Sequence, residues 1–104
     1  MIQFHGFNVT PIWTNYLDNG RTCLLLDCGG TMAASVNIDG PMEEDEIAIK
    51  DYSENIGMLR TLVGAGIVAE PHRWVRSGFV SIPICRMLEG PIVWKKLLAE
   101  EAAA

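Results

Sequence analysis

Apolar and polar positions alternate through the first third of the chain, and this pattern predicts antiparallel strands joined by tight turns. Asn19-Gly20 lies between an apolar run that ends at Leu17 and the run RTCLLLDC. Asn-Gly supplies the two positive-φ residues that a type I′ hairpin turn requires. Gly29-Gly30 separates the second run from a third, TMAASVNI. Both faces of the second run are largely apolar, so we expect it to be a central strand in a meander over residues 2–38.

A helical period replaces the two-residue period in the middle of the chain. Asp39-Gly40-Pro41 interrupts the strand pattern, and an acidic loop over residues 39–46 leads into a short strand, EIAIK. The next apolar residues recur at helical spacing and predict a helix over residues 53–65. Ser53 or Asp51 can cap its first turn.

The last third of the chain predicts two extended segments and a second helix. The segments occupy residues 72–88, and Pro83 favours an edge strand because proline has no N–H to donate. Gly90-Pro91 begins a helix over residues 91–102. One face of this helix is apolar and carries Val93, Trp94, Leu97 and Leu98.

These elements predict a single α+β domain over residues 1–104. We expect an antiparallel β-sheet meander of five or six strands, packed by one central helix, plus a C-terminal helix. A chain of 104 residues with 49% hydrophobic and 20% charged residues has the composition of one folded domain.

Charge is unevenly distributed along the chain. Residues 39–54 hold seven acids against the single base Lys50, a local net charge of −6, whereas residues 60–96 hold six bases against two acids. The whole chain carries −5. Because phosphate binding depends on lysine and arginine, we expect no direct nucleic-acid partner.

The cysteines and histidines predict no cofactor and no metal. Three cysteines are an odd number, which disfavours a disulfide framework, and the spacings of Cys23, Cys28, Cys85, His5 and His72 match no common metal site. Buried, inert thiols are the simpler interpretation. The N-terminus lacks the pattern of a signal peptide, and no apolar run is long enough to span a membrane, so we expect a cytoplasmic protein with no membrane partner.

Two short motifs suggest chemistry but have simpler explanations. The run LLLDCGGT resembles the phosphate-binding hairpin of sugar kinases in the actin and hexokinase superfamily, yet that family needs two large lobes, so Asp27, Gly29, Gly30 and Thr31 are expected to form only a turn. The cluster DYSEN at residues 51–55 contains the residue types that cap helices. We therefore predict that the protein is not an enzyme.

The segment from Glu44 to Leu88 resembles a small domain-of-unknown-function family encoded in bacteria, prophages and mobile elements. The similarity rests on an acidic loop, the runs IKDYSEN and GM before a helix, GIV, and the strand SGFVSIPIC with Leu88. With SVNI and the Asn-Gly hairpin it covers roughly residues 4–88. Ile56, where the family pattern has a glutamate, and the helix from Pro91 depart from it.

The resemblance implies a small, acidic, phage-associated protein, and such proteins often block host defence by stoichiometric binding. We therefore predict an inhibitor of a bacterial defence complex in the host cytoplasm, an anti-CRISPR protein that occupies a basic nucleic-acid-binding surface of a CRISPR effector. The predicted contact residues are Glu43, Glu44, Asp45, Glu46, Asp51 and Glu54. A solvated acidic loop with no binding role is as common.

Two alternatives stay open. The chain could be a self-assembling accessory module of a mobile element, with no defence role, that forms a homodimer through Val93, Trp94, Leu97 and Leu98. A small-molecule binder or enzyme would instead require a deep pocket at the Gly29-Gly30 turn or at the start of the central helix, and no nucleophile, base and orienting group are brought together by spacing.

Overall fold

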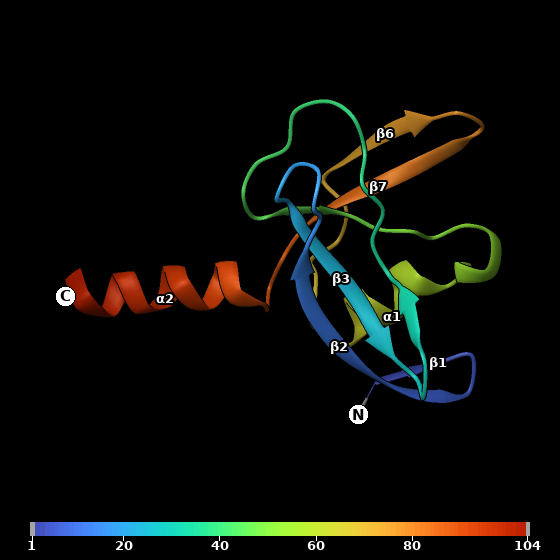
Figure 1. Ribbon diagram of the computed structural model, residues 1–104, viewed down its shortest axis with the longest axis horizontal. Helices are drawn as coiled ribbons and strands as arrows, with labels where there is room; N and C mark the ends of the chain where they lie inside the picture. Colours follow the sequence, from blue (N-terminus) through green and yellow to red (C-terminus); the bar gives the residue numbers. More distant parts are fainter. Residues whose placement is uncertain (1, 104) are drawn as a thin grey trace.

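The computed structural model describes residues 2–103 and has the predicted α+β class, with antiparallel strands and two α-helices (Figure 1). Met1 and Ala104, the ends of the predicted domain, lie outside the described residues. In chain order the elements are β1 (Ile2–Phe4), β2 (Phe7–Asn15), β3 (Thr22–Asp27), β4 (Thr31–Ala33), β5 (Glu46–Ala48), the 3-10 turn η1 (Ser53–Asn55), α1 (Met58–Gly64), β6 (Arg73–Ser77), β7 (Val80–Arg86) and α2 (Pro91–Ala103).

The strands of the described chain form two sheets, where the sequence pattern predicted one. The first sheet is the expected meander, in the order β1-β2-β3-β4, and β3 is a central strand as predicted. The second sheet has the order β5-β7-β6. Residues 34–38, predicted to continue the meander, instead cross between the sheets: Ser35 forms an isolated bridge with Ile49, and the Val36 N–H donates to Ala48.

The β2–β3 hairpin is confirmed, but its turn is not of type I′. Tyr16 and Arg21 close a four-residue loop in which the Tyr16 N–H donates to the Arg21 carbonyl at 2.8 Å. Gly20 has a φ of 72°, whereas Asn19 is not among the residues with positive φ. The Asn19 side chain instead accepts from the Arg21 N–H, so the loop is stabilised by a side chain rather than by a second left-handed residue.

Asp27, Gly29, Gly30 and Thr31 form the hairpin turn between β3 and β4. Asp27 pairs with Thr31, and its carboxylate accepts the Gly29 N–H at 3.0 Å. The polar groups of this turn therefore satisfy one another, as the simpler interpretation of the motif expected.

Pro83 lies in a central strand, which corrects the prediction of an edge strand. β7 is flanked by β5 and β6. The Pro83 carbonyl accepts the N–H of Ile49, the residue just after β5 ends. Because N and C=O of one strand residue point to the same side, the missing N–H of Pro83 faces the place where the β5 ladder stops.

The predicted helix over residues 53–65 is broken into η1 and α1. Gly57 has a φ of 99°, a left-handed conformation that interrupts the helix, and Ser53 also has a positive φ. The cap is Asp51, whose carboxylate accepts the N–H groups of Gly57 and Leu59 at 3.1 and 2.9 Å. The buried Asn55 amide donates to the Ala33 carbonyl at 2.6 Å, which ties η1 to β4.

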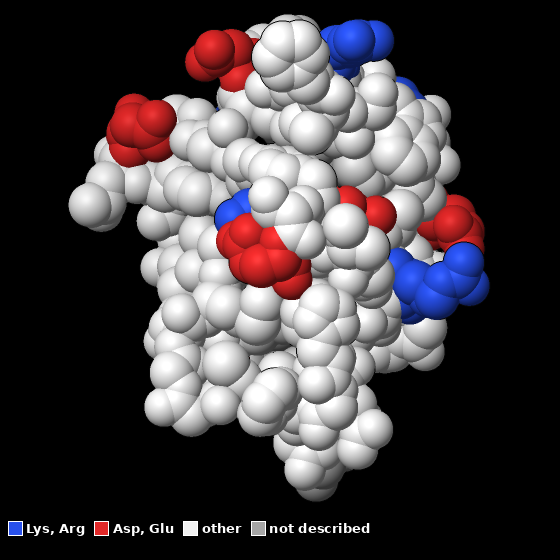
Figure 2. Space-filling view, turned by 90° about the vertical axis from the view of Figure 1, so that its right-hand side faces the viewer, with Lys and Arg blue, Asp and Glu red and all other residues white. Residues whose placement is uncertain are grey.

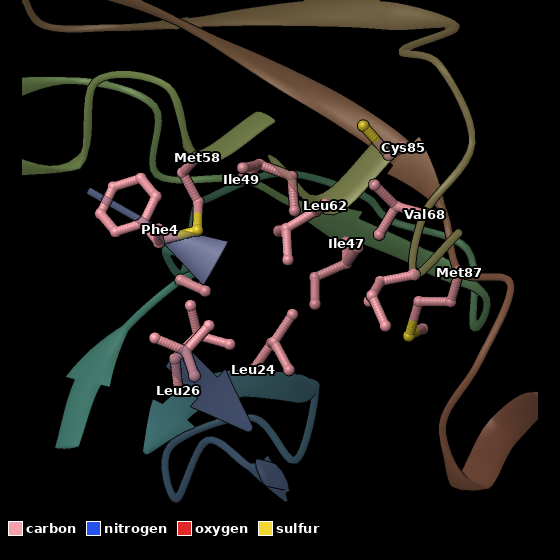
Figure 3. Packing of buried hydrophobic residues seen from close by; sticks show 13 residues of the cluster. Phe4, Leu24, Leu26, Ile47, Ile49, Met58, Leu62, Val68, Cys85 and Met87 are labelled. Carbon is pink, nitrogen blue, oxygen red and sulfur yellow. The ribbon is translucent and has the colours of Figure 1, made fainter. Parts of the chain in front are cut away.

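The main core lies between the first sheet, β5 and α1 (Figure 3). Leu24 and Leu26 from β3 face Ile47 from β5 and Leu62 from α1, all almost fully buried. α1 thus packs the sheet as predicted for the central helix. A smaller cluster of Ile38, Ala48, Ile82 and Ile84 lies on the second sheet.

The three cysteines are free thiols, but only two of them are buried. Cys23 and Cys85 are in the core, and burial raises the pKa of Cys85 to about 12, so its thiol stays protonated. Cys28 is exposed in the turn after β3, contrary to the expectation that all three thiols are buried.

α2 is present where the sequence predicted a C-terminal helix, and it extends away from the two sheets (Figure 1). It joins the body at Gly90, which is buried and has a φ of 105°. A Cβ atom at this position would lie 2.9 Å from the indole ring of Trp13. The direction of α2 is therefore set by a glycine pressed against the first sheet.

Replacing Gly90 by alanine should destabilise the protein. The new methyl group would force both a strained φ and a shift of the Trp13 ring, and we expect a loss of about 2–4 kcal/mol in the free energy of unfolding, measured in urea. Gly30→Ala is the matched control, because Gly30 has open space around it and no positive φ. Equal stability of the two variants would contradict this account of the joint.

Candidate protein-interaction surfaces

Glu46, predicted to lie on an exposed partner-binding surface, is buried. Its side chain is only 3% exposed. The carboxylate accepts two hydrogen bonds from Arg73, one from Nε and one from Nη2, both at 2.9 Å. It also accepts a hydrogen bond from the Glu43 N–H at 2.8 Å and contacts His72 Nε2 at 2.5 Å. A partner protein cannot reach this carboxylate without opening the fold.

Arg73 is the main cause of a lowered pKa at Glu46. Together with hydrogen bonds from Glu43 N–H and His72 it outweighs burial and lowers the pKa of Glu46 from 4.5 to about 2. The group is therefore a charged carboxylate at neutral pH, held by a bidentate arginine.

Arg86 binds two further acids of the predicted surface. Its Nη1 donates to Asp45 at 2.7 Å and its Nη2 donates to Glu43 at 3.0 Å. These two hydrogen bonds raise the pKa of Arg86. Arg73 also donates to the Pro41 carbonyl at 3.2 Å. Arginines from the basic part of the sequence thus form ion pairs with acids from the acidic part, so opposite charges that are far apart along the chain lie next to each other in the fold.

The remaining predicted acids are Asp51, Glu54 and Glu44. Asp51 is half-buried and caps α1, and Glu54 is exposed and receives Lys50 Nζ at 2.6 Å. Glu44 is exposed, and it is the one of the six predicted acids for which residues 2–103 provide no hydrogen bond or ion pair. Figure 2 shows separate acidic clusters, some beside basic groups, on one face of the molecule. The six carboxylates therefore do not form one continuous acidic surface.

Sequence reasoning missed His72, Arg73 and Arg86 as partners of the acidic segment. One signal was present: Glu46 begins the apolar strand run EIAIK, and strand period places it on the face of Ala48, which is buried. A carboxylate at such a position needs an arginine from elsewhere in the chain.

The predicted dimer face of α2 is largely exposed, with one exception. Trp94, Leu97 and Leu98 are 51%, 53% and 66% exposed. Val93, by contrast, is half-buried and packs with Ile92 against the main core. The first turn of α2 therefore anchors the helix, and the apolar surface beyond it is unpartnered within the described chain.

A groove of about 540 Å³ runs along the outer side of α1. It is lined by Asp51, Ile56, Leu59, Arg60, Val63 and Glu70, among others. It adjoins the DYSEN segment, where a small-molecule site was considered. The Asp51 carboxylate on its wall is already occupied by two backbone N–H groups.

Comparisons with known proteins found no matching family model, no matching curated protein and no matching solved structure. The resemblance to a phage-associated family therefore stays a prediction. Among residues 2–103, no three His, Cys, Asp or Glu side chains lie close enough to hold a metal ion. No helix in that range is long and apolar enough to cross a membrane.

Glu46 should make the stability of the protein depend on acid pH. Because its pKa is lowered on folding, its contribution is fully present above pH 4.5 and is lost as the pH falls from 4.5 to about 2. The shift corresponds to about 3 kcal/mol, at about 1.4 kcal/mol per pKa unit.

Urea unfolding of wild type and Glu46→Gln at a series of pH values tests this contribution. The variant should be less stable at pH 6, and the difference should shrink as the pH approaches 2. Glu44→Gln, which alters an exposed acid of the same loop, should follow the wild-type curve. A pH-independent difference between wild type and Glu46→Gln would refute the role of this carboxylate.

Proposed function

We propose that this protein is a non-enzymatic module that self-associates through α2. The observation that supports the proposal is the projecting apolar face of this helix, formed by Trp94, Leu97 and Leu98. Exposed apolar side chains that lie next to one another in a patch often mark a protein–protein interaction site, whereas single exposed apolar residues are common on any surface. Aromatic residues such as Trp94 are enriched among the residues that dominate interface energetics.

The energetics of α2 favour a partner. A helix of this length is marginal in water by itself, and most helical stability comes from packing an apolar face. Of the α2 side chains described, up to Ala102, those that pack against the main core are Ile92 and Val93 in the first turn. Docking of the exposed face would add about 25 cal/mol for each Å² of apolar surface removed from water.

Light scattering should therefore give a dimer for the wild-type protein and a monomer for the double variant Leu97→Ser, Leu98→Ser. These substitutions remove apolar side chains that are at least half exposed, so the fold of the body should be unchanged by circular dichroism. Phe79→Ser is the control, because Phe79 is fully exposed in the turn between β6 and β7, which lies away from α2 (Figure 1).

The control variant should remain dimeric. A monomeric wild-type protein at about 100 μM, a concentration at which interfaces of modest affinity are occupied, would contradict the proposed function.

A second candidate function is inhibition of a bacterial defence complex, with an anti-CRISPR protein as its most specific form. It is supported by the family resemblance and by the exposure of Glu43, Glu44 and Glu54. The contact surface is smaller than the sequence suggested, because Glu46 is buried and Asp51 caps a helix. Glu44 is the acid most available to a protein partner, since its carboxylate is exposed and forms no hydrogen bond or ion pair with the described residues.

The inhibitor function predicts capture of a CRISPR effector subunit from a host lysate. The tagged wild-type protein should recover the subunit at low salt and release it at high salt. Glu44→Lys combined with Glu54→Lys should abolish the capture, whereas Glu70→Lys, a charge reversal at an exposed acid elsewhere, should not. Reversal of Asp45 or Glu46 is unsuitable as a test because it would break ion pairs that hold the fold.

Recovery of an effector subunit equally well by both charge variants would refute the acidic mechanism. Recovery of no subunit by the wild-type protein would exclude this function for that host and leave self-association as the remaining proposal.

A further inference from the structure

The order of charges along α2 does not serve the helix itself. Lys95 and Lys96 lie in the half nearest the body, and Glu100 and Glu101 lie in the far half. A helix favours acids at its N-terminal end and bases at its C-terminal end, so this order opposes the macrodipole of α2. The same order becomes favourable when a second helix runs alongside in the opposite direction, because lysines then face glutamates.

Glu101 decides between the two directions of pairing. Residues four apart lie on the same face of a helix, so Glu101 shares the face of Leu97 and lies beside the apolar stripe. In a parallel pair of α2 helices, the two Glu101 carboxylates would meet across the interface and repel each other. In an antiparallel pair, Glu101 can lie level with a lysine of the second copy.

Side-chain size fits the antiparallel direction and fixes its centre. If the two-fold axis passes at Leu98, residues equally distant from Leu98 lie at the same height along the two helices. Lys95 is then level with Glu101 of the second copy, and both residues lie beside Leu98 on the helix surface, three positions before and after it. Trp94 is level with Ala102, whose small side chain leaves room for the indole, and the two Leu98 side chains meet at the axis.

We infer, on the basis of the self-association proposed above, that two copies of this chain pair their α2 helices antiparallel across a two-fold axis at Leu98. The helix is about 20 Å long, so this arrangement separates the two bodies at opposite ends of the paired helices. The interface is isologous and closed, which limits assembly to a dimer.

Charge exchange between Lys95 and Glu101 tests the direction. These residues are six apart, so they are not neighbours on one helix, and an effect must arise between copies. Glu101→Lys should weaken the dimer about ten-fold by sedimentation analysis, as expected for the loss of two partly exposed ion pairs. Lys95→Glu should weaken it similarly, and the variant with both changes should recover wild-type affinity.

Disulfide cross-linking tests the position of the axis. In a Cys28→Ser background, which removes the exposed thiol, Leu98→Cys should form a covalent dimer under mild oxidation. Glu101→Cys should not, because in the antiparallel pair its two copies are separated along the axis by six residues, about 9 Å. The background variant without an added cysteine is the control.

Two results would overturn the inference while leaving self-association intact. One is equal cross-linking of Leu98→Cys and Glu101→Cys, which indicates parallel helices. The other is a dimer whose affinity is unchanged by Glu101→Lys. A wild-type protein that is monomeric by light scattering would instead overturn the proposed function and this inference together.

Discussion

The carboxylate of Glu46 connects the acidic loop before β5 to both edge strands of the second sheet, β5 and β6. It begins β5, receives a bidentate arginine from β6, and accepts the N–H of Glu43 from the preceding loop. β5 in turn supplies Ile47 to the main core and leads into Ile49, which bridges to Ser35 in the segment that crosses between the two sheets. Loss of this carboxylate would leave Arg73 without its main anionic partner and remove the side-chain bridge from β5 to β6 across β7.

Local patterns predicted much of the fold because local contacts determine it. The β2–β3 hairpin, the central position of β3 and the helix from Pro91 follow from periodicity and from the turn preferences of glycine and proline. The break at Gly57 was missed because the apolar spacing continues across it. At the break Gly57 is left-handed, and the Asn55 side chain beside it donates to the carbonyl of Ala33, twenty-two residues earlier.

The candidate surfaces were harder to predict, and for a related reason. Glu46 and Arg73 are twenty-seven residues apart, and Arg86 is forty-one residues from Asp45. No local rule pairs them. The acidic run therefore indicated a charged surface, whereas in the fold most of its carboxylates form hydrogen bonds or ion pairs with other groups of the same chain. The apolar face of α2 was visible in the sequence, because residues three and four apart on a helix share a face, but the burial of Val93 depends on how the helix leaves the body.

The joint at Gly90 bears on the proposed self-association through α2. Association costs conformational entropy when the contacting element must be ordered at the moment of binding. Here the left-handed Gly90 against Trp13, followed by Ile92 and Val93 on the core, fixes the direction of the first turn before any partner arrives. The order of the remaining turns then follows from helix propagation, which is far less costly than nucleation. A helix that starts from an anchored turn presents Trp94, Leu97 and Leu98 in a defined orientation, and more of the free energy of burying them is left for association.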